Sequence, residues 1–329
     1  MKRFIVSMFV AVFMLFAIPL LSMAQDQPAA PVAPGVVVLK IAAGSSSGIY
    51  EEFEKEIQAE IGDSVQLQVV PSHSATENLD HLMGNDVNLA LMTSDVLFFR
   101  TSVDDTSGLR TLLVLFPEDV NIVTLNQPYK LPKKNAFDFN NKSYTISDIS
   151  DLDGLPVGTA GGGFITCNVI KQQARINFDI HKYASGSDAL TGLRNGEVAA
   201  VVLVGAAPLP ALKDLGADYK LVSVNDTVVS ELTAVYKKHN ITYNNISQIP
   251  VQTISAPCLL VTRNYKGKKN IDALLKIRES ITNGLPDLQE TTGNHKAWQL
   301  VEPKEHGKFP WFTGQPDTEE TNSQPIVNQ

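Results

Sequence analysis

The chain has 329 residues, of which 43% are hydrophobic and 19% charged, and its 35 acidic and 27 basic residues give a formal net charge of −8. The acidic balance makes nucleic acids and anionic membrane surfaces poor partner candidates. At about 100 to 200 residues per domain, a chain of this length is expected to fold as two lobes.

The first 24 residues have the features of a secretory signal peptide. Lys2 and Arg3 precede an apolar run at 4–21, and Ser-Met-Ala at 22–24 supplies small residues at the two positions that a signal peptidase needs. A retained membrane anchor is the alternative, because the apolar run approaches the roughly 18 residues of a spanning helix. Cleavage predicts a periplasmic protein and, by removing Lys2 and Arg3, takes the net charge from −8 to −10.

Strand and helix patterns alternate after a Pro/Ala-rich arm at 25–35. The run 36–43 predicts a buried strand, and apolar residues recur every four positions at 49–61, as on one face of a helix whose five glutamates mostly face solvent. Alternation at 65–70 predicts a second strand, a capping box at 74–77 opens a second helix, and a third strand follows from 87 to 95. The βαβαβ order predicts a parallel sheet.

The pattern then repeats approximately. Residues 155–170 again predict strand, glycine loop and helix, and 184–204 follows the spacing of 72–92. Between the repeats, the strand-like passages 109–125 and 251–263 could each carry the chain from one lobe to the other. Two crossings would form a hinge, with the ligand enclosed in the cleft between the lobes.

These patterns set the expected domain boundaries. The predicted segments are the signal peptide 1–24, the arm 25–35, the first part of lobe I at 36–123, lobe II at 124–252, the return to lobe I with C-terminal helices at 253–312, and a flexible tail at 313–329. The tail is polar and acidic, as is typical of flexible segments. An apolar stripe from Ile271 to Ile281 predicts a helix that packs on the first lobe.

Cys167 and Cys258 are the only cysteines. The expected compartment is oxidising, so a disulfide between them is allowed. Their spacing does not establish one, and two buried free thiols are an equal alternative.

The loop at 44–48, Gly-Ser-Ser-Ser-Gly, fits two kinds of site. As a nucleophile elbow it would make Ser46 a hydrolase nucleophile. Only one strand precedes it in the mature chain, however, and none of the six histidines has a catalytic or metal-binding signature around it. The chain is therefore not expected to be an enzyme or to carry a metal or other cofactor.

The alternative is an anion-binding cradle. Backbone N–H groups and Ser hydroxyls at a helix N-terminus hold carboxylates well, and a second glycine loop near Gly161 occupies the same place in the repeated unit. Ordinary tight turns that use glycine for geometry alone are the simpler explanation. Glu51 and Glu52 in the first helical turn would disfavour an anionic ligand if they face the cleft.

The order of six segments resembles the TAXI family of solute receptors, which serve TRAP transporters. The segments are GSSSGIY, SHSATENLDHLMGNDVNLALMTSDV, LRTLLVLFPEDV, ISDLDGLPVGTAGGG, GLRNGEVAAVVLVGAAPLPALKDL and IPVQTISAPCLLVTR. The resemblance implies an α/β, type II periplasmic-binding-protein fold of two lobes joined by a two-segment hinge. It also implies a small organic acid as ligand, such as glutamate or a dicarboxylate, and integral-membrane TRAP permease subunits as partners.

The same resemblance implies which residues contact the ligand. In lobe I they are Ser45, Ser46, Ser47, Ile49, Tyr50, Ser74, Asn78, Thr93, Ser94 and Asp95; in lobe II they are Thr159, Gly161, Gly162, Gly163, Thr166, Ala207 and Pro208. Hydroxyls and loop N–H groups would hold carboxylate oxygens, Asn78 would orient the ligand, and Tyr50 would pack on it. Ser74 and Asp95 have a simpler alternative role as helix caps.

The chain departs from the family pattern in both glycine loops. The first loop has Ser-Ser-Gly-Ile where the family usually has Thr-Gly-Gly before its aromatic residues, and the second has Gly-Gly-Gly-Phe-Ile-Thr in place of Gly-Ser-Gly-Thr. No arginine falls in a matched motif, so a bidentate carboxylate clamp is absent from the pattern. The alternative functions are a two-lobed sensory or scaffold receptor no longer coupled to transport and, with less support, a serine hydrolase.

Overall fold

The computed structural model describes residues 35–43, 49–131, 142–302 and 308–315. The predicted signal peptide, most of the arm, the serines of the first loop and the tail beyond residue 315 lie outside these ranges. Within them, no helix is long and apolar enough to cross a membrane.

The first βαβαβ unit forms as predicted. Its strands β1 (Val37–Ala42), β2 (Val65–Val70) and β3 (Leu89–Thr93) are parallel, and the helices α1 (Ile49–Ile61), α2 (Ala75–Met83) and α3 (Ser94–Thr101) follow them in turn. A 3-10 turn, η1 (Gly62–Ser64), separates α1 from β2. The third strand is shorter than predicted because α3 begins at Ser94.

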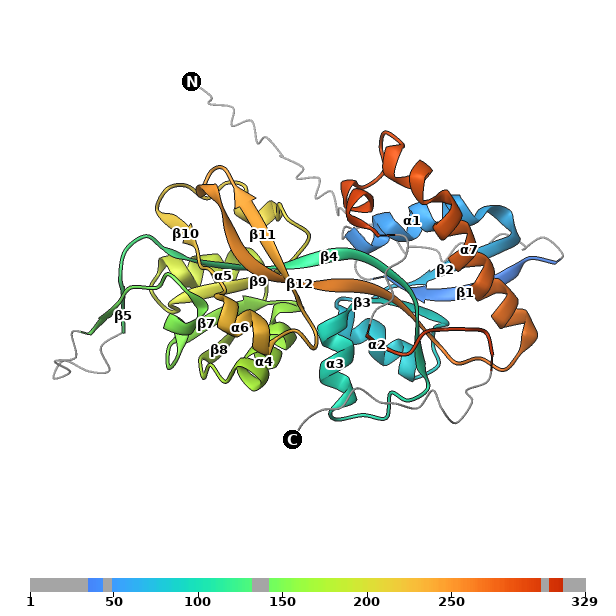
Figure 1. Ribbon diagram of the computed structural model, residues 1–329, viewed down its shortest axis with the longest axis horizontal. Coiled ribbons are helices and arrows are strands. Elements are labelled where there is room, and N and C mark those ends of the chain that lie inside the picture. The colour runs from blue at the N-terminus through green and yellow to red at the C-terminus, as the bar shows by residue number, and fades with distance from the viewer. Residues whose placement is uncertain (1–34, 44–48, 132–141, 303–307, 316–329) are drawn as a thin grey trace, which may run out of the picture. The chain divides into compact units, whose positions relative to one another are not determined.

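Two long strands then join this unit to the rest of the chain (Figure 1). They are β4 (Leu109–Leu125) and β12 (Ser247–Arg263), each of 17 residues, and they pair with each other in antiparallel fashion. From Asp119 onward β4 also pairs with β9 (Ala200–Gly205), which belongs to the second unit. The predicted pair of crossing strands is thus confirmed, and it joins both units into one mixed sheet of order β2-β1-β3-β12-β4-β9-β7-β8.

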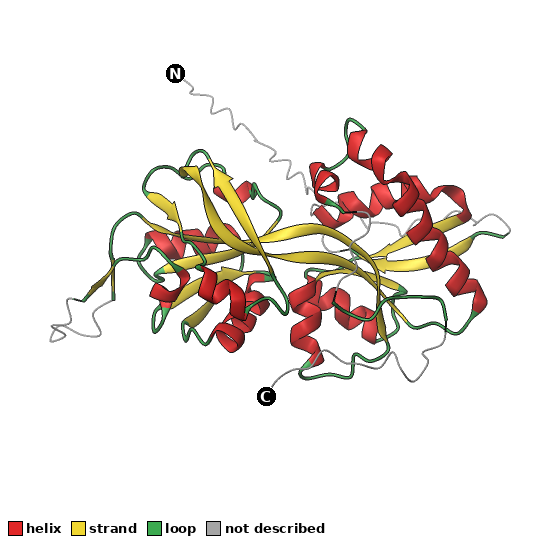
Figure 2. Cartoon of the chain, viewed as in Figure 1, coloured by secondary structure: helices red, strands yellow, loops and turns green. Residues whose placement is uncertain are grey.

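The second unit repeats the first. Strand β7 (Pro156–Ala160) is parallel to both β8 (Asp179–Tyr183) and β9, with α4 (Gly163–Ala174) and α5 (Gly186–Arg194) as its connecting helices. The remaining elements are β5 (Tyr129–Lys130), β6 (Ser143–Tyr144), η2 (Ile149–Leu152), η3 (Pro210–Leu212), β10 (Tyr219–Leu221), α6 (Asp226–Glu231) and β11 (Lys237–Tyr243). Figure 2 shows helices beside the strands in both units, as expected for a two-lobed α/β fold.

Matching serines begin the second helix of each unit. The Ser74 side chain accepts a hydrogen bond from the N–H of Glu77 at the start of α2, and Ser185 does the same for Asp188 at the start of α5. Glu77 in turn accepts from the N–H of His73 rather than of Ser74, so the predicted capping box is displaced by one residue.

The helix predicted from Ile271 to Ile281 is α7 (Lys268–Glu290), and it shares one hydrophobic cluster with α1. Trp298, in the turn η4 (Lys296–Leu300), stacks on Phe53 of α1 with ring centroids 4.4 Å apart. The α1 glutamates are accordingly less exposed than predicted: Glu54 is buried, and Glu56 accepts hydrogen bonds from the Trp298 indole and the N–H of His295. The glutamates of α1 were expected to face solvent because nothing near them in the sequence indicates that α7 and η4, more than 200 residues later, pack against this helix.

Both cysteines are free thiols in this structure, and both are buried. Cys258 lies on β12 and Cys167 in α4. Of the two alternatives that the sequence left open, the structure has the pair of buried thiols.

Candidate functional site

Three carboxylates are buried where the two units meet. Asp95 lies in the first turn of α3, and Glu118 and Asp119 lie in the middle of β4, with exposures of 1%, 7% and 2%. At this place Pro117 of β4 is opposite Pro257 of β12, and the pairing of the two strands becomes irregular just beyond that point. The carboxylates therefore occupy the position at which β4 begins to pair with the second unit.

Asp95 connects the first unit to the second. Its Oδ2 accepts hydrogen bonds from the Thr166 hydroxyl of α4, at 2.5 Å, and from the Tyr236 hydroxyl, at 2.9 Å. The neighbouring Ser94 hydroxyl donates to the carbonyl of Val235 at 3.2 Å. The other Asp95 oxygen, Oδ1, is buried and has no hydrogen-bond partner among the residues that the structure describes.

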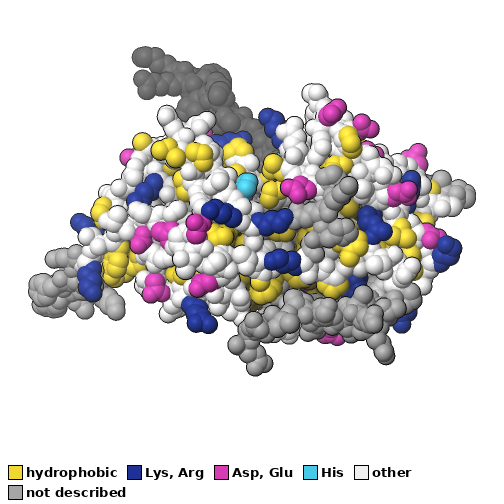
Figure 3. Space-filling model, in the orientation of Figure 1, with side chains coloured by type: hydrophobic (Ala, Val, Ile, Leu, Met, Phe, Trp, Pro, Cys, Tyr) yellow, Lys and Arg dark blue, Asp and Glu magenta, His cyan; other side chains and the backbone are white. Residues whose placement is uncertain are grey.

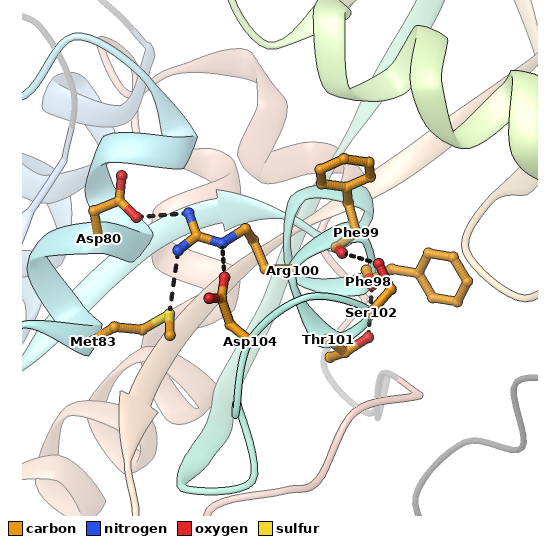
Figure 4. Close-up of polar contacts among 8 residues, drawn as sticks. All are labelled: Asp80, Met83, Phe98, Phe99, Arg100, Thr101, Ser102 and Asp104. Atoms are coloured by element: carbon orange, nitrogen blue, oxygen red, sulfur yellow. Dashed lines mark hydrogen bonds and ion pairs between the residues drawn. The ribbon is translucent and has the colours of Figure 1, made fainter.

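Arg100 holds the opposite end of α3. Its guanidinium lies between α2 and the segment that follows α3, donating to Asp80 at 2.6 Å and also to Asp104, with the Met83 sulfur at 3.8 Å (Figure 4). This ion pair with two carboxylates fixes α3 against α2. Contacts at both ends of α3 therefore hold Asp95 in position: those of Ser94 and Asp95 at its start and those of Arg100 near its end.

Glu118 has a neutral partner, Tyr50 of α1. The Tyr50 hydroxyl donates to Glu118 Oε1 at 2.5 Å. Burial raises the pKa of Glu118 to about 7, and the negative charges of Asp95 and Asp119 add to the rise while the Tyr50 hydrogen bond opposes it. Burial also raises the pKa of Tyr50, with further contributions from Cys258 and Glu118.

Asp119 has a partner that can carry positive charge. Its Oδ1 lies 2.5 Å from Nδ1 of His239 on β11, and its Oδ2 accepts from the N–H of Ala207 at 3.3 Å. The hydrogen bond to Asp119 raises the pKa of His239, whose side chain is partly exposed. Asp119 thereby orders the turn that contains Ala207 and Pro208, both of which were predicted ligand contacts.

The other predicted contacts in the first unit have varied surroundings. Ser45, Ser46 and Ser47 lie outside the described residues. Ile49 and Tyr50 are partly buried at the start of α1, and Thr93 is buried at the end of β3. Asn78 is fully buried, where its Oδ1 accepts from Ser72 and its Nδ2 donates to the carbonyl of Leu91 at 2.7 Å. Asn78 thus links the segment after β2 to β3.

The second glycine loop is shaped partly by packing. Gly161 has a positive φ of 56°, which favours glycine. A Cβ on Gly163 would come 2.3 Å from the Thr159 hydroxyl, which itself donates to the carbonyl of Val202 at 2.8 Å. Gly161 and Gly162 both have open space around them, but Gly162 has a φ of −61°, so neither packing nor backbone conformation explains its lack of a side chain.

We call the place where the two units meet, around Asp95, Glu118 and Asp119, the junction. Four of its residues were not predicted from the sequence: Glu118, Asp119, Tyr236 and His239. A usable signal was present for the first two, since consecutive acids follow a proline in the middle of an otherwise apolar strand pattern at 109–125. Tyr236 and His239 had no local signal, because they reach the junction only through the antiparallel pairing of β11 with β12.

The junction brings buried carboxylates together with hydroxyl groups. Among the described residues, no group of three or more His, Cys, Asp or Glu side chains could hold a metal ion. Figure 3 shows basic side chains near the middle of one face, beside hydrophobic ones.

Three solved structures with a similar chain fold are those of ligand-binding proteins. Tv2483 bound to L-arginine is 11% identical, with 82% of this chain and 94% of that chain covered and a TM-score of 0.50. The GluR0 ligand-binding core from Nostoc punctiforme in complex with L-glutamate is 15% identical, with 80% and 96% covered and a TM-score of 0.47. An arginine transport system periplasmic binding protein from Legionella pneumophila is 16% identical, with 76% and 95% covered and a TM-score of 0.44.

At these identities the likeness concerns the fold, which is the predicted type II periplasmic-binding-protein fold of two lobes. No curated protein sequence matches the chain. The match to a family extends over residues 41–302, which include both crossing strands and both units except for the start of β1. The chain belongs to the NMT1-like family.

Proposed function

We propose that this protein is a periplasmic receptor that binds a small, carboxylate-bearing solute between its lobes and releases it unchanged to the membrane subunits of a TRAP transporter. The observation that carries the proposal is the set of hydrogen bonds between the two units. Ser94 donates to the carbonyl of Val235, and Asp95 accepts from the hydroxyls of Thr166 and Tyr236. These contacts lie beside two continuous strands, β4 and β12, about which the lobes would open and close.

The roles proposed for the binding residues follow from this arrangement. On closure, Thr166 and Tyr236 approach Asp95 and complete one side of the site. The loops at 44–48 and 161–163 would supply backbone N–H groups and hydroxyls to the solute carboxylate, as helix N-termini do for anions. The Ala207–Pro208 turn, ordered by Asp119, would border the site.

Binding is tested by thermal unfolding of the mature protein, freed of bound solute by unfolding and refolding. The panel consists of amino acids, keto acids and dicarboxylates. A solute at 100 times its dissociation constant stabilises the folded state by about 2.7 kcal/mol, which raises the unfolding midpoint by several degrees. A specific shift supports the receptor; a flat response across the whole panel, repeated by calorimetry, contradicts it.

The coupling to a TRAP permease needs a separate test in the source cells. Uptake of the identified solute should be lost when the gene is deleted and restored by a copy on a plasmid. Collapse of the ion gradient with an ionophore should then stop uptake even while ATP is maintained. Uptake that instead follows ATP would assign the receptor to another class of transporter, and unaltered uptake after deletion would favour a sensory role.

A further inference from the structure

We infer that the solute carries a cationic nitrogen, an ammonium or guanidinium group, and that Asp95 Oδ1 together with Glu118 forms its binding site. The inference rests on the proposed function, because it names the chemistry of a solute held between the lobes. It gives a specific role to Asp95, which the sequence indicated only as one of the ligand contacts or as a helix cap.

The first observation is an unused acceptor. Asp95 is 1% exposed, and its Oδ2 accepts hydrogen bonds from two hydroxyls. Its Oδ1 is buried and has no partner within the described part of the chain. Buried polar atoms are nearly always hydrogen-bonded, so an orphan carboxylate oxygen in a native protein requires a reason. A donor supplied by the solute is such a reason, since it is present only when the solute is bound.

The second observation is the charge around this oxygen. Asp95 and Asp119 are both close enough to Glu118 for their negative charges to add to the rise that burial causes in its pKa. Asp119 is also paired with His239. Asp95 and Glu118 receive hydrogen bonds only from the neutral hydroxyls of Thr166, Tyr236 and Tyr50 among the described residues.

No ion pair between described residues joins a Lys or Arg to any of the three carboxylates; the one pairing partner is His239, on Asp119. A cation entering the junction would therefore meet the buried Asp95 and Glu118, neither of which has a Lys or Arg partner among the described residues, and it would favour the ionised form of Glu118. An anion in the same place would meet their repulsion at short range in a poorly hydrated environment.

The donor set favours a nitrogen cation over a metal ion. No three metal-ligating side chains lie together among the described residues. The Asp95 carboxylate has one oxygen already occupied by hydroxyl donors and one left for a further donor, which suits an N–H group. Hydrogen bonds from a cationic N–H to a carboxylate are about twice as strong as neutral ones.

Together with a carboxylate at the glycine loops, a cation at Asp95 implies a zwitterion of the amino-acid class. Keto acids and simple dicarboxylates have no group for Asp95 and would bring further negative charge to it. Glutamate and dicarboxylates, which the TAXI resemblance allows equally, should therefore differ in affinity for this protein.

The test is isothermal titration of the wild-type chain with solute pairs that differ at one group. L-glutamate is compared with 2-oxoglutarate, and L-arginine with L-citrulline, each from low to millimolar concentration. If the site holds an ammonium group, L-glutamate should bind at least tenfold more tightly than 2-oxoglutarate, which lacks that group. If it holds a guanidinium group, L-arginine should bind at least tenfold more tightly than L-citrulline, which keeps the ammonium but lacks the guanidinium charge. Binding of 2-oxoglutarate with no response to any of the three amino acids overturns the inference while leaving the receptor intact.

Substitutions of Asp95 and Glu118 test which side chains bind the cationic group of the solute. Asp95→Asn keeps an oxygen for Thr166 and Tyr236 but places an amide NH₂ at the unpartnered position, and should weaken binding of the cationic solute at least tenfold. Glu118→Gln should weaken it less. Asp148→Asn is the matched control, because Asp148 is hydrogen-bonded to Ser223 and Asn225 in the second unit and its loss removes the same charge.

Circular dichroism and the unfolding midpoint establish that each variant folds. If Asp95→Asn does not fold, the solute pairs on the wild-type chain decide alone. Unchanged affinity in a folded Asp95→Asn protein overturns the assignment of the site. Absence of binding to every solute, amine-bearing or not, contradicts the proposed function and the inference with it.

Discussion

Replacing Gly163 by alanine tests whether the second glycine loop is shaped by packing. The new Cβ would lie 2.3 Å from the Thr159 hydroxyl and 2.9 Å from the carbonyl oxygen of Val202. The clash would displace the Thr159 hydroxyl from its 2.8 Å hydrogen bond to Val202. Overpacking costs about 1–3 kcal/mol and a buried hydrogen bond left unmade about 1–3 kcal/mol, so we expect a loss of about 2–6 kcal/mol in the free energy of unfolding.

Gly162→Ala is the control one residue earlier. No heavy atom lies within 4 Å of its added Cβ, and its φ of −61° suits alanine. This substitution should leave stability unchanged or raise it by about 0.4–1 kcal/mol, because alanine reduces the entropy of the unfolded chain. If Gly162 approaches the solute closely, the same substitution should weaken binding without loss of stability.

Urea unfolding of both variants, followed by circular dichroism, measures the difference. In a double variant, Thr159→Ala with Gly163→Ala, removal of the hydroxyl should make the combined loss smaller than the sum of the single losses. Equal stabilities of the Gly163 and Gly162 variants would refute the packing explanation. The loop would then have to be explained by the ligand alone.

Three further substitutions probe the core and the junction. Trp298→Ala should cost about 3–5 kcal/mol in urea unfolding, because it removes a fully buried ring stacked on α1; a loss below 1 kcal/mol would contradict that packing. Thr166→Val removes one donor to Asp95 and should weaken solute binding, measured by titration, more than Thr124→Val, whose hydroxyl bonds to a carbonyl within the second unit. Glu118, with a pKa raised from 4.5 to about 7, keeps its proton longer in the folded state, so its contribution to stability is lost as the pH rises from about 4.5 to about 7. Glu118→Gln should remove that part of the pH dependence in unfolding experiments from pH 4 to 8, and identical profiles for variant and wild type would show that the group does not titrate there.

Local periodicity predicted the elements that repeat. The four-residue spacing of α1, the alternation of β2 and the serine caps of α2 and α5 all depend on neighbours within a few positions. The two crossing strands were also predictable, because a 17-residue apolar run such as β4 is too long for one lobe and lacks helical spacing. The repeated helices and strands and the two long strands were therefore the parts of the fold that the sequence predicts.

The junction was harder to predict because its contacts join distant parts of the chain. Asp95 meets Tyr236 across 141 positions, and Asp119 meets His239 across 120. Glu54 was misjudged for the same reason, since its burial depends on the late part of the chain that covers α1. Helix propensity and capping signals predict which helix or strand each of these residues belongs to. They do not predict which residues lie close together, because that depends on the order of the strands in the sheet.

The pairing of β4 with β12 has a consequence for how this architecture can be rearranged. Asp119 lies opposite Ser255, so the chain leaves for the second unit and returns from it at neighbouring points of one ladder. The second unit is therefore a continuous insert with adjoining ends, the arrangement in which domain insertion is best tolerated. In a related chain, the second unit could be replaced as a whole by changing only its two connections to β4 and β12. Such a chain would have a new second lobe, while the paired strands that carry Glu118 would stay unchanged.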